Sequence, residues 1–457
     1  MMKIRFSRIG LLMWLVFSAA LTAGAASGSG AEYWRDPVFL KRFMGSYGVR
    51  SEIEPSISPE EKAVFDGIVA QIQSDPAGAI QKLNSATTSS SSAALDFTLG
   101  NLHFQQEDFA AAAPRYRAAI EKFPDFMRAH KNLGMAEFRN DRIEDAIKSL
   151  AKSLELGGED GGVYGVLGHA YLKTERHTSA ESAYRKALLF DPDYLPWKEG
   201  LANALLAQER YASAVVLFDE LLRADSGKAI YWLGQADAYL GLGRSLDAAS
   251  NYEMVRRMGK GSMNSLLNLG DIYLNEDLSD RAVVVYLEAL DRGGDVCVDC
   301  LFDRCDAVVS RADGEDATRL FAAIRESRSD GLSKEHELKL LRLESRVMIA
   351  RGDVDKAVDI LNKILERDPL DGESLLLLGE YRADAGERDQ AALLYERAGR
   401  IEGFEAKALA RRAELLAQRN KFKAAIGLLR NAQAIDPQPN VAAFLDQVER
   451  LAKAFAE

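Results

Sequence analysis

Small side chains recur along this chain at a fixed interval of 34 residues. One series is Ala112, Ala146, Ala180, Ala214, Ala248 and Ala282, and it resumes at Ala357, Ala391 and Ala425. A second, twelve positions upstream, is Gly100, Gly134, Gly168, Ala202, Ala236 and Gly270. Such an interval is typical of tandem helical hairpins that bury their apolar sides only against their neighbours. The sequence therefore predicts an all-α solenoid of tandem helix-turn-helix repeats.

Each repeat also places bulky side chains at fixed positions around these small residues. The third repeat shows the whole pattern, with Leu167, Gly168, Tyr171, Ala180, Tyr184, Ala187 and Pro192. We expect the small residues to let the two helices of a hairpin approach, and the ring of Tyr184 to fill the space between hairpins. Pro192 ends the second helix, because proline has no N–H and clashes with the preceding turn.

On these residues the chain resembles the tetratricopeptide-repeat family over roughly residues 93–437. The resemblance implies a right-handed superhelix whose concave groove, lined by the first helices, binds a peptide or a partner protein. It implies no catalysis and no cofactor. With its N-terminal leader the chain resembles the exported bacterial members. The segments RAHKNLG and YGVLGHAYLKTERHTSAESAYRKAL are similar to repeat proteins that accompany TonB-type outer-membrane energy-transduction systems.

The register of the repeats divides the chain into segments. They are a signal peptide at 1–25, an aromatic and basic arm at 26–58, an atypical helical hairpin at 59–92, six repeats at 93–296, a degenerate repeat at 297–337, three repeats at 338–439 and a capping helix at 440–457. The first hairpin opens at Ser58 and Pro59, a capping residue and a residue suited to the first helical position. The lost register at 297–337 indicates a joint between two blocks of repeats.

The first 25 residues have the pattern of a secretory signal peptide. Lys3, Arg5 and Arg8 precede a short apolar run at 9–20, and the small residues at 23–25 match a cleavage site. The run is shorter than the roughly 20 apolar residues of a membrane span. We therefore expect export, to the periplasm or beyond, with cleavage near Ala25. An uncleaved N-terminal anchor is the alternative.

The arm differs in composition from the repeats. We expect a short helix over residues 37–44. Two interpretations stay open: the arm caps the first hairpin, or it docks on a partner or in the groove of its own chain. Its aromatic residues Tyr33, Trp34, Phe39, Phe43 and Tyr47 are interleaved with Arg35, Lys41, Arg42 and Arg50.

Composition and motifs exclude several classes of function. The net charge of −11 disfavours general nucleic-acid binding, which needs clustered Lys and Arg, although a local basic patch remains compatible with it. The five histidines are scattered, and the sequence has no Ser-His-Asp set, no glycine-rich phosphate loop and no cluster with metal-ligand spacing. The sequence therefore predicts no enzyme, no cofactor, no metal and no small-molecule substrate.

The family resemblance assigns partner binding to repeat positions 2, 5, 9, 12 and 13 of the first helices. The N-terminal part of this groove would be basic with aromatic floors and the middle acidic, which would orient an extended ligand. The alternative is that these are ordinary solvated charges. Residue by residue, the groove comprises Phe97, Asn101, Phe104, Arg128, Lys131, Phe138, Arg139, His169, Lys173, Asn203, Asp237 and Asp271, with Met135, Leu172, Glu199 and Asn275 beside them.

The family also has a carboxylate clamp for the C-termini of chaperones. Asn101 and Asn132 stand where the clamp has asparagine. Phe97, Gly162 and Val166 stand where it requires cations. The sequence therefore disfavours binding of chaperone tails.

Three cysteines, Cys297, Cys300 and Cys305, cluster near the joint. Leu301 follows the second of them, where haem attachment needs histidine. A structural zinc site needs four ligands, and the histidine nearest in sequence to the three cysteines is His336. In an exported protein we expect one local disulfide and one leftover thiol, with a redox function as the alternative.

These observations predict a non-catalytic scaffold for protein–protein interaction in the bacterial cell envelope. The partner, a protein or peptide, would lie in the concave groove. The alternative is an accessory component of a TonB-type outer-membrane transport system, associated with envelope membrane complexes.

Overall fold

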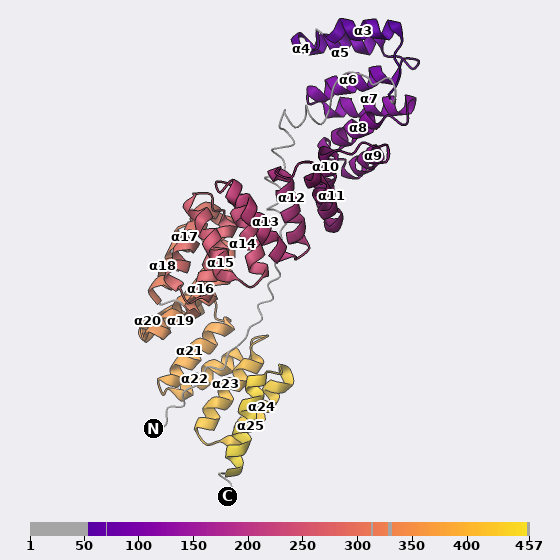
Figure 1. Cartoon of the computed structure of the whole chain (residues 1–457). Helices are drawn as coiled ribbons and strands as arrows, with labels where there is room; N and C mark the ends of the chain where they lie inside the picture. Colours follow the sequence, from indigo (N-terminus) through magenta and orange to yellow (C-terminus); the bar gives the residue numbers. More distant parts are fainter. Residues whose placement is uncertain (1–53, 70, 312–313, 328–330, 455–457) are drawn as a thin grey trace. The chain divides into compact units, whose positions relative to one another are not determined.

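The computed structural model describes residues 54–69, 71–311, 314–327 and 331–454. Within these ranges the chain forms 23 α-helices and no strand, which confirms the all-α repeat fold (Figure 1). The chain divides into two units, Met1–Asn251 and Tyr252–Glu457. The expected signal peptide, the arm up to residue 53 and the expected helix at 37–44 lie outside the described residues.

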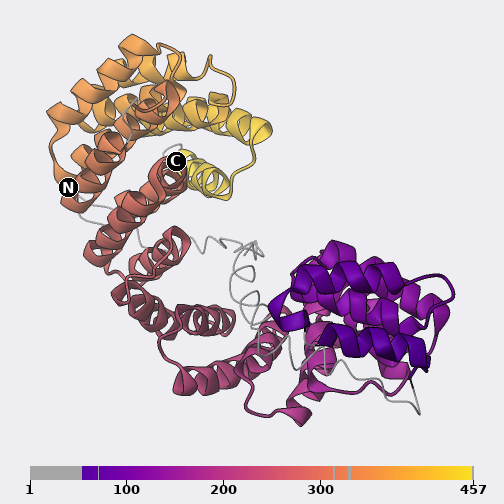
Figure 2. The same cartoon turned by 90° about the horizontal axis from the view of Figure 1, so that it is seen from above.

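The first unit stacks helical hairpins on a short N-terminal group of helices, and Figure 2 shows the same helices from above. The N-terminal group is α3 (Pro59–Val69), α4 (Gln71–Ser74) and α5 (Pro76–Ala86). The hairpins are α6 (Ala93–Gln105) with α7 (Phe109–Lys122), α8 (Met127–Arg139) with α9 (Ile143–Glu155), α10 (Gly161–Lys173) with α11 (His177–Phe190), α12 (Leu195–Ala207) with α13 (Tyr211–Ala224), and α14 (Ala229–Gly241) with the start of α15 (Ser245–Arg257).

The second unit continues with the end of α15 and further antiparallel helices. They are α16 (Met263–Asn275), α17 (Ser279–Arg311), α18 (Gly314–Glu326), α19 (Lys334–Arg351), α20 (Val354–Arg367), α21 (Gly372–Asp384), α22 (Arg388–Ala398), α23 (Glu405–Gln418), α24 (Phe422–Ile435) and α25 (Pro439–Ala454). The last helix packs on α24, where Val448 is fully buried.

Helix α3, the first described helix of the chain, begins with a capping box. The backbone N–H of Glu61 donates to Ser58 Oγ at 3.2 Å, and the backbone N–H of Ser58 donates to the Glu61 carboxylate at 2.8 Å. This reciprocal pair satisfies N–H groups that the first helical turn leaves without partners. The start of α3 is therefore determined by local sequence.

The first and second helices of a repeat are joined through one residue in the left-handed conformation. It occupies the same repeat position each time: Glu107, Asp141, Glu175, Glu209 and Asp277 have φ of 57–58°, and Gly243 has 71°. A side chain is strained in this conformation, whereas glycine is not. The turn is therefore imposed by the packing of the two helices rather than by the residue at that position.

Small residues lie where helices pack closely. Tyr184 is fully buried between two glycines: a Cβ on Gly168, in the same hairpin, would lie 2.9 Å from its ring, and a Cβ on Gly200, in the next, would lie 2.2 Å away. Contacts below 3.0 Å are too short for a real side chain. Glycine therefore allows both approaches, within a hairpin and between hairpins.

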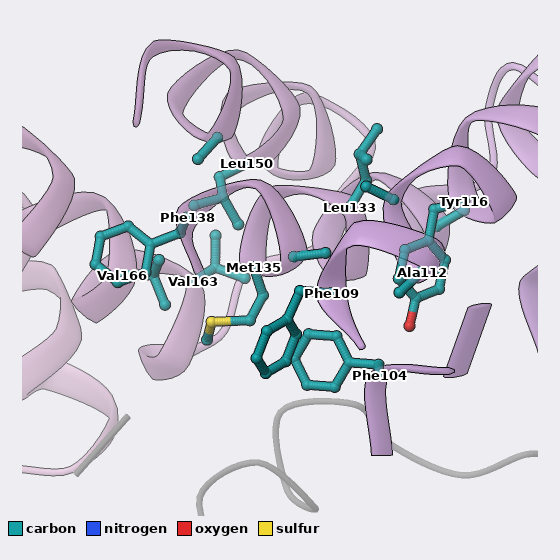
Figure 3. Packing of buried hydrophobic residues seen from close by; sticks show 14 of the residues in the cluster. Phe104, Phe109, Ala112, Tyr116, Leu133, Met135, Phe138, Leu150, Val163 and Val166 are labelled. Carbon is teal, nitrogen blue, oxygen red and sulfur yellow. The ribbon is translucent and has the colours of Figure 1, made fainter. Parts of the chain in front are cut away.

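The core is shared between neighbouring hairpins. In Figure 3 the rings of Phe104 and Phe109 lie beside Met135, and Phe138 lies beside Val166 of the following hairpin. These side chains come from α6, α7, α8 and α10. Each hairpin of the first unit therefore completes its neighbour's core, as expected for a solenoid.

The structure differs from the sequence-based expectation at the joint. There α17 runs without a break through 33 residues, Ser279–Arg311. The expected end of the sixth repeat at residue 296 falls inside this helix. Glycine alone destabilises a helix by only about 1 kcal/mol, and the sequence has no proline between Pro196 and Pro369 to stop it.

Candidate binding surface on the first helices

The predicted partner-binding residues lie on the first helices of the hairpins. In the first unit α6, α8, α10, α12 and α14 contact one another in that order. We call the side of these five helices that carries repeat positions 2, 5, 9, 12 and 13 the first-helix face. It holds every predicted residue except Asp271 and Asn275, which lie on α16 of the second unit.

The three predicted aromatic floor residues are buried. Phe97, Phe104 and Phe138 are 1 %, 2 % and 7 % exposed. The ring of Phe97 lies 4.7 Å from that of Phe126, and the ring of Phe104 lies 4.9 Å from that of Phe109. These rings belong to the core of the first unit, where Figure 3 shows Phe104 and Phe138, and they present almost no surface to a partner.

The two clamp-like asparagines bond to each other. The side-chain amide of Asn132 and the hydroxyl of Tyr116 both donate to Asn101 Oδ1, at 2.8 Å each. Both asparagines are at most 2 % exposed. Since burying an unpaired amide is unfavourable, this network stabilises the contact between α6, α7 and α8. In this structure Asn101 therefore joins neighbouring helices through buried hydrogen bonds.

The predicted cations have partners within the chain. Arg128 donates to both carboxylate oxygens of Glu54, with Nη2 2.8 Å from Oε2, and its guanidinium lies 5.0 Å from the Phe97 ring centroid. Lys131 pairs with Asp160, the residue that caps α10. The first of these pairs joins residues 74 positions apart in sequence.

The remaining cations lie over aromatic rings. The guanidinium of Arg139 is 4.2 Å from the ring centroid of Phe109. Lys173 donates to Asp141 at 2.8 Å and lies 5.7 Å from the ring centroid of Phe138. Of the predicted cations, Lys173 is the most exposed, with 44 % of its side-chain surface accessible. It is therefore the cation best placed to meet a partner.

His169 lies between the basic and acidic parts of the face. Its ring is 5.4 Å from that of Phe138, edge to face. Burial, and secondarily the charge of Lys173, lowers the pKa of His169 to about 4. His169 is therefore neutral at pH 7.

The acidic residues follow on the next two first helices and beyond. Glu199 on α12 is buried, and Asn203 on α12 and Asp237 on α14 are half-buried. Asp271, in the second unit, accepts the hydroxyl of Tyr286 and both Arg304 donors at 2.7 Å. Asp271 is therefore part of an internal network there.

The cysteines lie on α17. Cys300 and Cys305 are free thiols in this structure, and the side chain of Cys297 lies outside the described residues. Burial raises the pKa of Cys305 to about 12, so its thiol is protonated at neutral pH. A disulfide between Cys297 and either of the other two stays a prediction.

Two further features bear on chemistry. Among the described residues, no three His, Cys, Asp or Glu side chains are grouped so as to hold a metal ion. None of the helices in the described ranges has the length and apolar character to cross a membrane.

Sequence reasoning did not identify Glu54 as the partner of Arg128. The sequence shows only an acid at the end of the arm, and no local pattern relates it to a residue so far along the chain. A pairing over this distance is visible only in the folded structure.

Comparison with known proteins identifies the repeats. A tetratricopeptide-repeat family profile matches residues 97–160, 166–229, 233–295 and 343–403. The chain is 30% identical over 103 residues to the small glutamine-rich tetratricopeptide repeat-containing protein 2 of Mycosarcoma maydis. That match covers 22% of this chain and only 29% of the relative.

Solved structures are similar at low sequence identity. A tetratricopeptide repeat protein from Parabacteroides merdae is 19% identical, with a TM-score of 0.36, over 58% of this chain and 98% of that one. The Pseudomonas aeruginosa protein PilF is 20% identical, with a TM-score of 0.36, over 44% of this chain and 90% of that one. Since the family profile matches more than half of the 457 residues, the chain belongs to the tetratricopeptide-repeat family.

Proposed function

We propose that this chain is a non-catalytic scaffold of a bacterial cell envelope that holds a protein partner on its first-helix face. Proteins of the tetratricopeptide-repeat family mediate protein–protein interactions, through surfaces that stacked hairpins make continuous. The leader pattern at residues 1–25 supports the envelope location.

Charge changes sign along the first-helix face, and this observation best supports a binding role. α8 and α10 carry cations, whereas α12 and α14 carry anions. An extended partner with the opposite order of charges would bind in one direction only, because the reversed direction places like charges together. The residues concerned are Arg128, Lys131, Arg139 and Lys173, then Glu199 and Asp237.

Reversing one charge at each end of the face tests this proposal. The double variant Lys173→Glu with Asp237→Lys changes two side chains that keep some exposure. The matched control is Lys148→Glu, whose side chain is 77% exposed on the second helix α9. We expect affinity capture from solubilised envelope, read by mass spectrometry, to lose its main partner with the double variant and keep it with the control. If both variants capture the partner equally well and their circular dichroism is unchanged, the first-helix face is not the binding surface.

The envelope location has its own test. We expect N-terminal sequencing of the exported protein to begin just after Ala25. A full-length chain found in the cytoplasm would contradict the location. Co-purification with the inner-membrane proteins of a TonB-type system would instead identify the accessory role.

A further inference from the structure

The described chain begins on the first-helix face. Glu54 and Pro55 are buried, and Glu54 is the carboxylate that pairs with Arg128 near the start of α8. Two residues on, the carbonyl oxygen of Ser56 accepts the hydroxyl of Ser92, the capping residue of α6, at 2.7 Å. This end of the arm therefore already lies across the starts of two first helices.

Burial changes along the face at equivalent repeat positions. Positions 9 and 12 are almost completely buried on α6 and α8, and half-buried on α12 and α14. The residues on α6 and α8 pack within the first unit, whereas the α12–α14 end leaves side-chain surface that a docked segment can contact. The buried residues are Asn101, Phe104, Met135 and Phe138, and the half-buried ones are Asn203, Leu206, Asp237 and Leu240.

The order of charges in the arm complements that of the face. In sequence, Glu52 and Glu54 stand at the end of the arm that Glu54 joins to Arg128 of α8. Residues 35–50, further from this anchor, include Arg35, Lys41, Arg42 and Arg50 and a single acid. An arm that runs from α8 towards α14 would bring these cations to Glu199 and Asp237.

The arm also has the length and apolar content for this path. Residues 31–53 contain five aromatic side chains, whose burial against the face would be favourable. Packed helices are roughly 10 Å apart, and an extended chain advances roughly 3.3 Å per residue. The segment is thus long enough to cross several first helices.

We propose that residues 31–53 dock on the first-helix face of their own chain, from α8 towards α14, with the Glu54–Arg128 pair as the anchor. A partner that uses the basic half of the face must then displace this segment. Only this second statement depends on the proposed function, because docking within the chain needs no partner.

Photo-crosslinking of the full chain tests the docking directly. p-Benzoylphenylalanine is placed at Phe43, the sample is irradiated, and the crosslinked peptides are mapped by mass spectrometry. We expect adducts within one chain on peptides of α8, α10 or α12. Adducts confined to α3–α5, or joining two chains, would overturn the proposal.

Proteolysis tests the anchor. Trypsin should cleave after Lys41 and Arg42 about tenfold faster in Arg128→Glu than in the unchanged chain, the effect expected for loss of one charge-assisted pair. The charge swap Glu54→Arg with Arg128→Glu should restore slow cleavage. Arg176→Glu, which removes an exposed ion pair with Glu144, is the matched control and should leave the rate unchanged. Equal cleavage rates in all four proteins would contradict the proposal that the Glu54–Arg128 pair anchors the arm.

Neither measurement contains a partner. Failure of both would therefore overturn the docked arm and leave the proposed scaffold standing. Loss of partner binding with the arm still docked would count against the scaffold alone.

Discussion

The ring of Tyr184 lies against the backbone of Gly200, so close that a Cβ there would come within 2.2 Å of Tyr184 Cζ. Gly200→Ala should therefore destabilise the first unit by about 1–3 kcal/mol, because the ring must shift in a filled core. Urea unfolding followed by circular dichroism measures the change. In Gly427→Ala, the control, the added methyl meets nothing within 4 Å, so this helical glycine variant should be slightly stabilised. Equal effects of the two changes would contradict the packing argument.

Asp271 accepts hydrogen bonds from two residues, Arg304 and Tyr286, that are largely shielded from water. Asp271→Ala should destabilise the second unit by about 3 kcal/mol, because Arg304 and Tyr286 lose their shared acceptor. The midpoint of chemical unfolding reports the loss. Asp291→Ala, at an exposed position of α17, is the control and should change it by less than about 0.5 kcal/mol. A small effect at Asp271 would show that water replaces the lost contacts.

The left-handed residue between α12 and α13 can be relieved of strain. Glu209 has φ of 58°, so Glu209→Gly should raise stability by about 0.5–1 kcal/mol. Glu209→Ala removes the charge but keeps the Cβ, and it should give no such gain. Thermal unfolding of the two variants side by side separates the backbone effect from the electrostatic one.

Acid should destabilise the first unit through His169. Its pKa is about 4 in the folded state, below the value near 6.5 of an unfolded chain, so the unfolded state takes up the proton first. The stability that depends on the neutral ring is thus complete above about pH 6.5 and is lost as the pH falls towards 4. His169→Gln should show a shallower fall in unfolding temperature over this interval. An NMR titration with a midpoint near 6.5 would contradict the prediction.

The two described thiols should differ in reactivity. Cys305 is fully buried with its pKa raised to about 12, whereas Cys300 is half-buried. Under reducing, native conditions a maleimide should therefore label Cys300 well before Cys305, because the thiolate is the reactive form. Peptide mass spectrometry at successive times gives the order. Simultaneous labelling would indicate that α17 opens readily.

The fold was largely predictable because its signals are local. The glycine at 168 and the alanine at 180 recur with the repeat, so they indicate helices and their contacts without any knowledge of distant residues. The end of the sixth repeat was not predictable in this way, because Gly293 and Gly294 resemble a turn until the packing of α17 is known.

The candidate surface was less predictable. A family position states which way a side chain tends to face, but not whether another segment covers it, and Phe97 and Phe104 are buried. The pairing of Glu54 with Arg128 depends on the folded path of the chain. No short pattern in the sequence encodes it.

The unbroken α17 has a mechanical consequence for the second unit. Because this one helix contacts α16, α18 and α19, those helices cannot detach separately. Under a pulling force, ordinary hairpins should peel off in small, equal increments of extension, whereas this region should give way in a single longer jump.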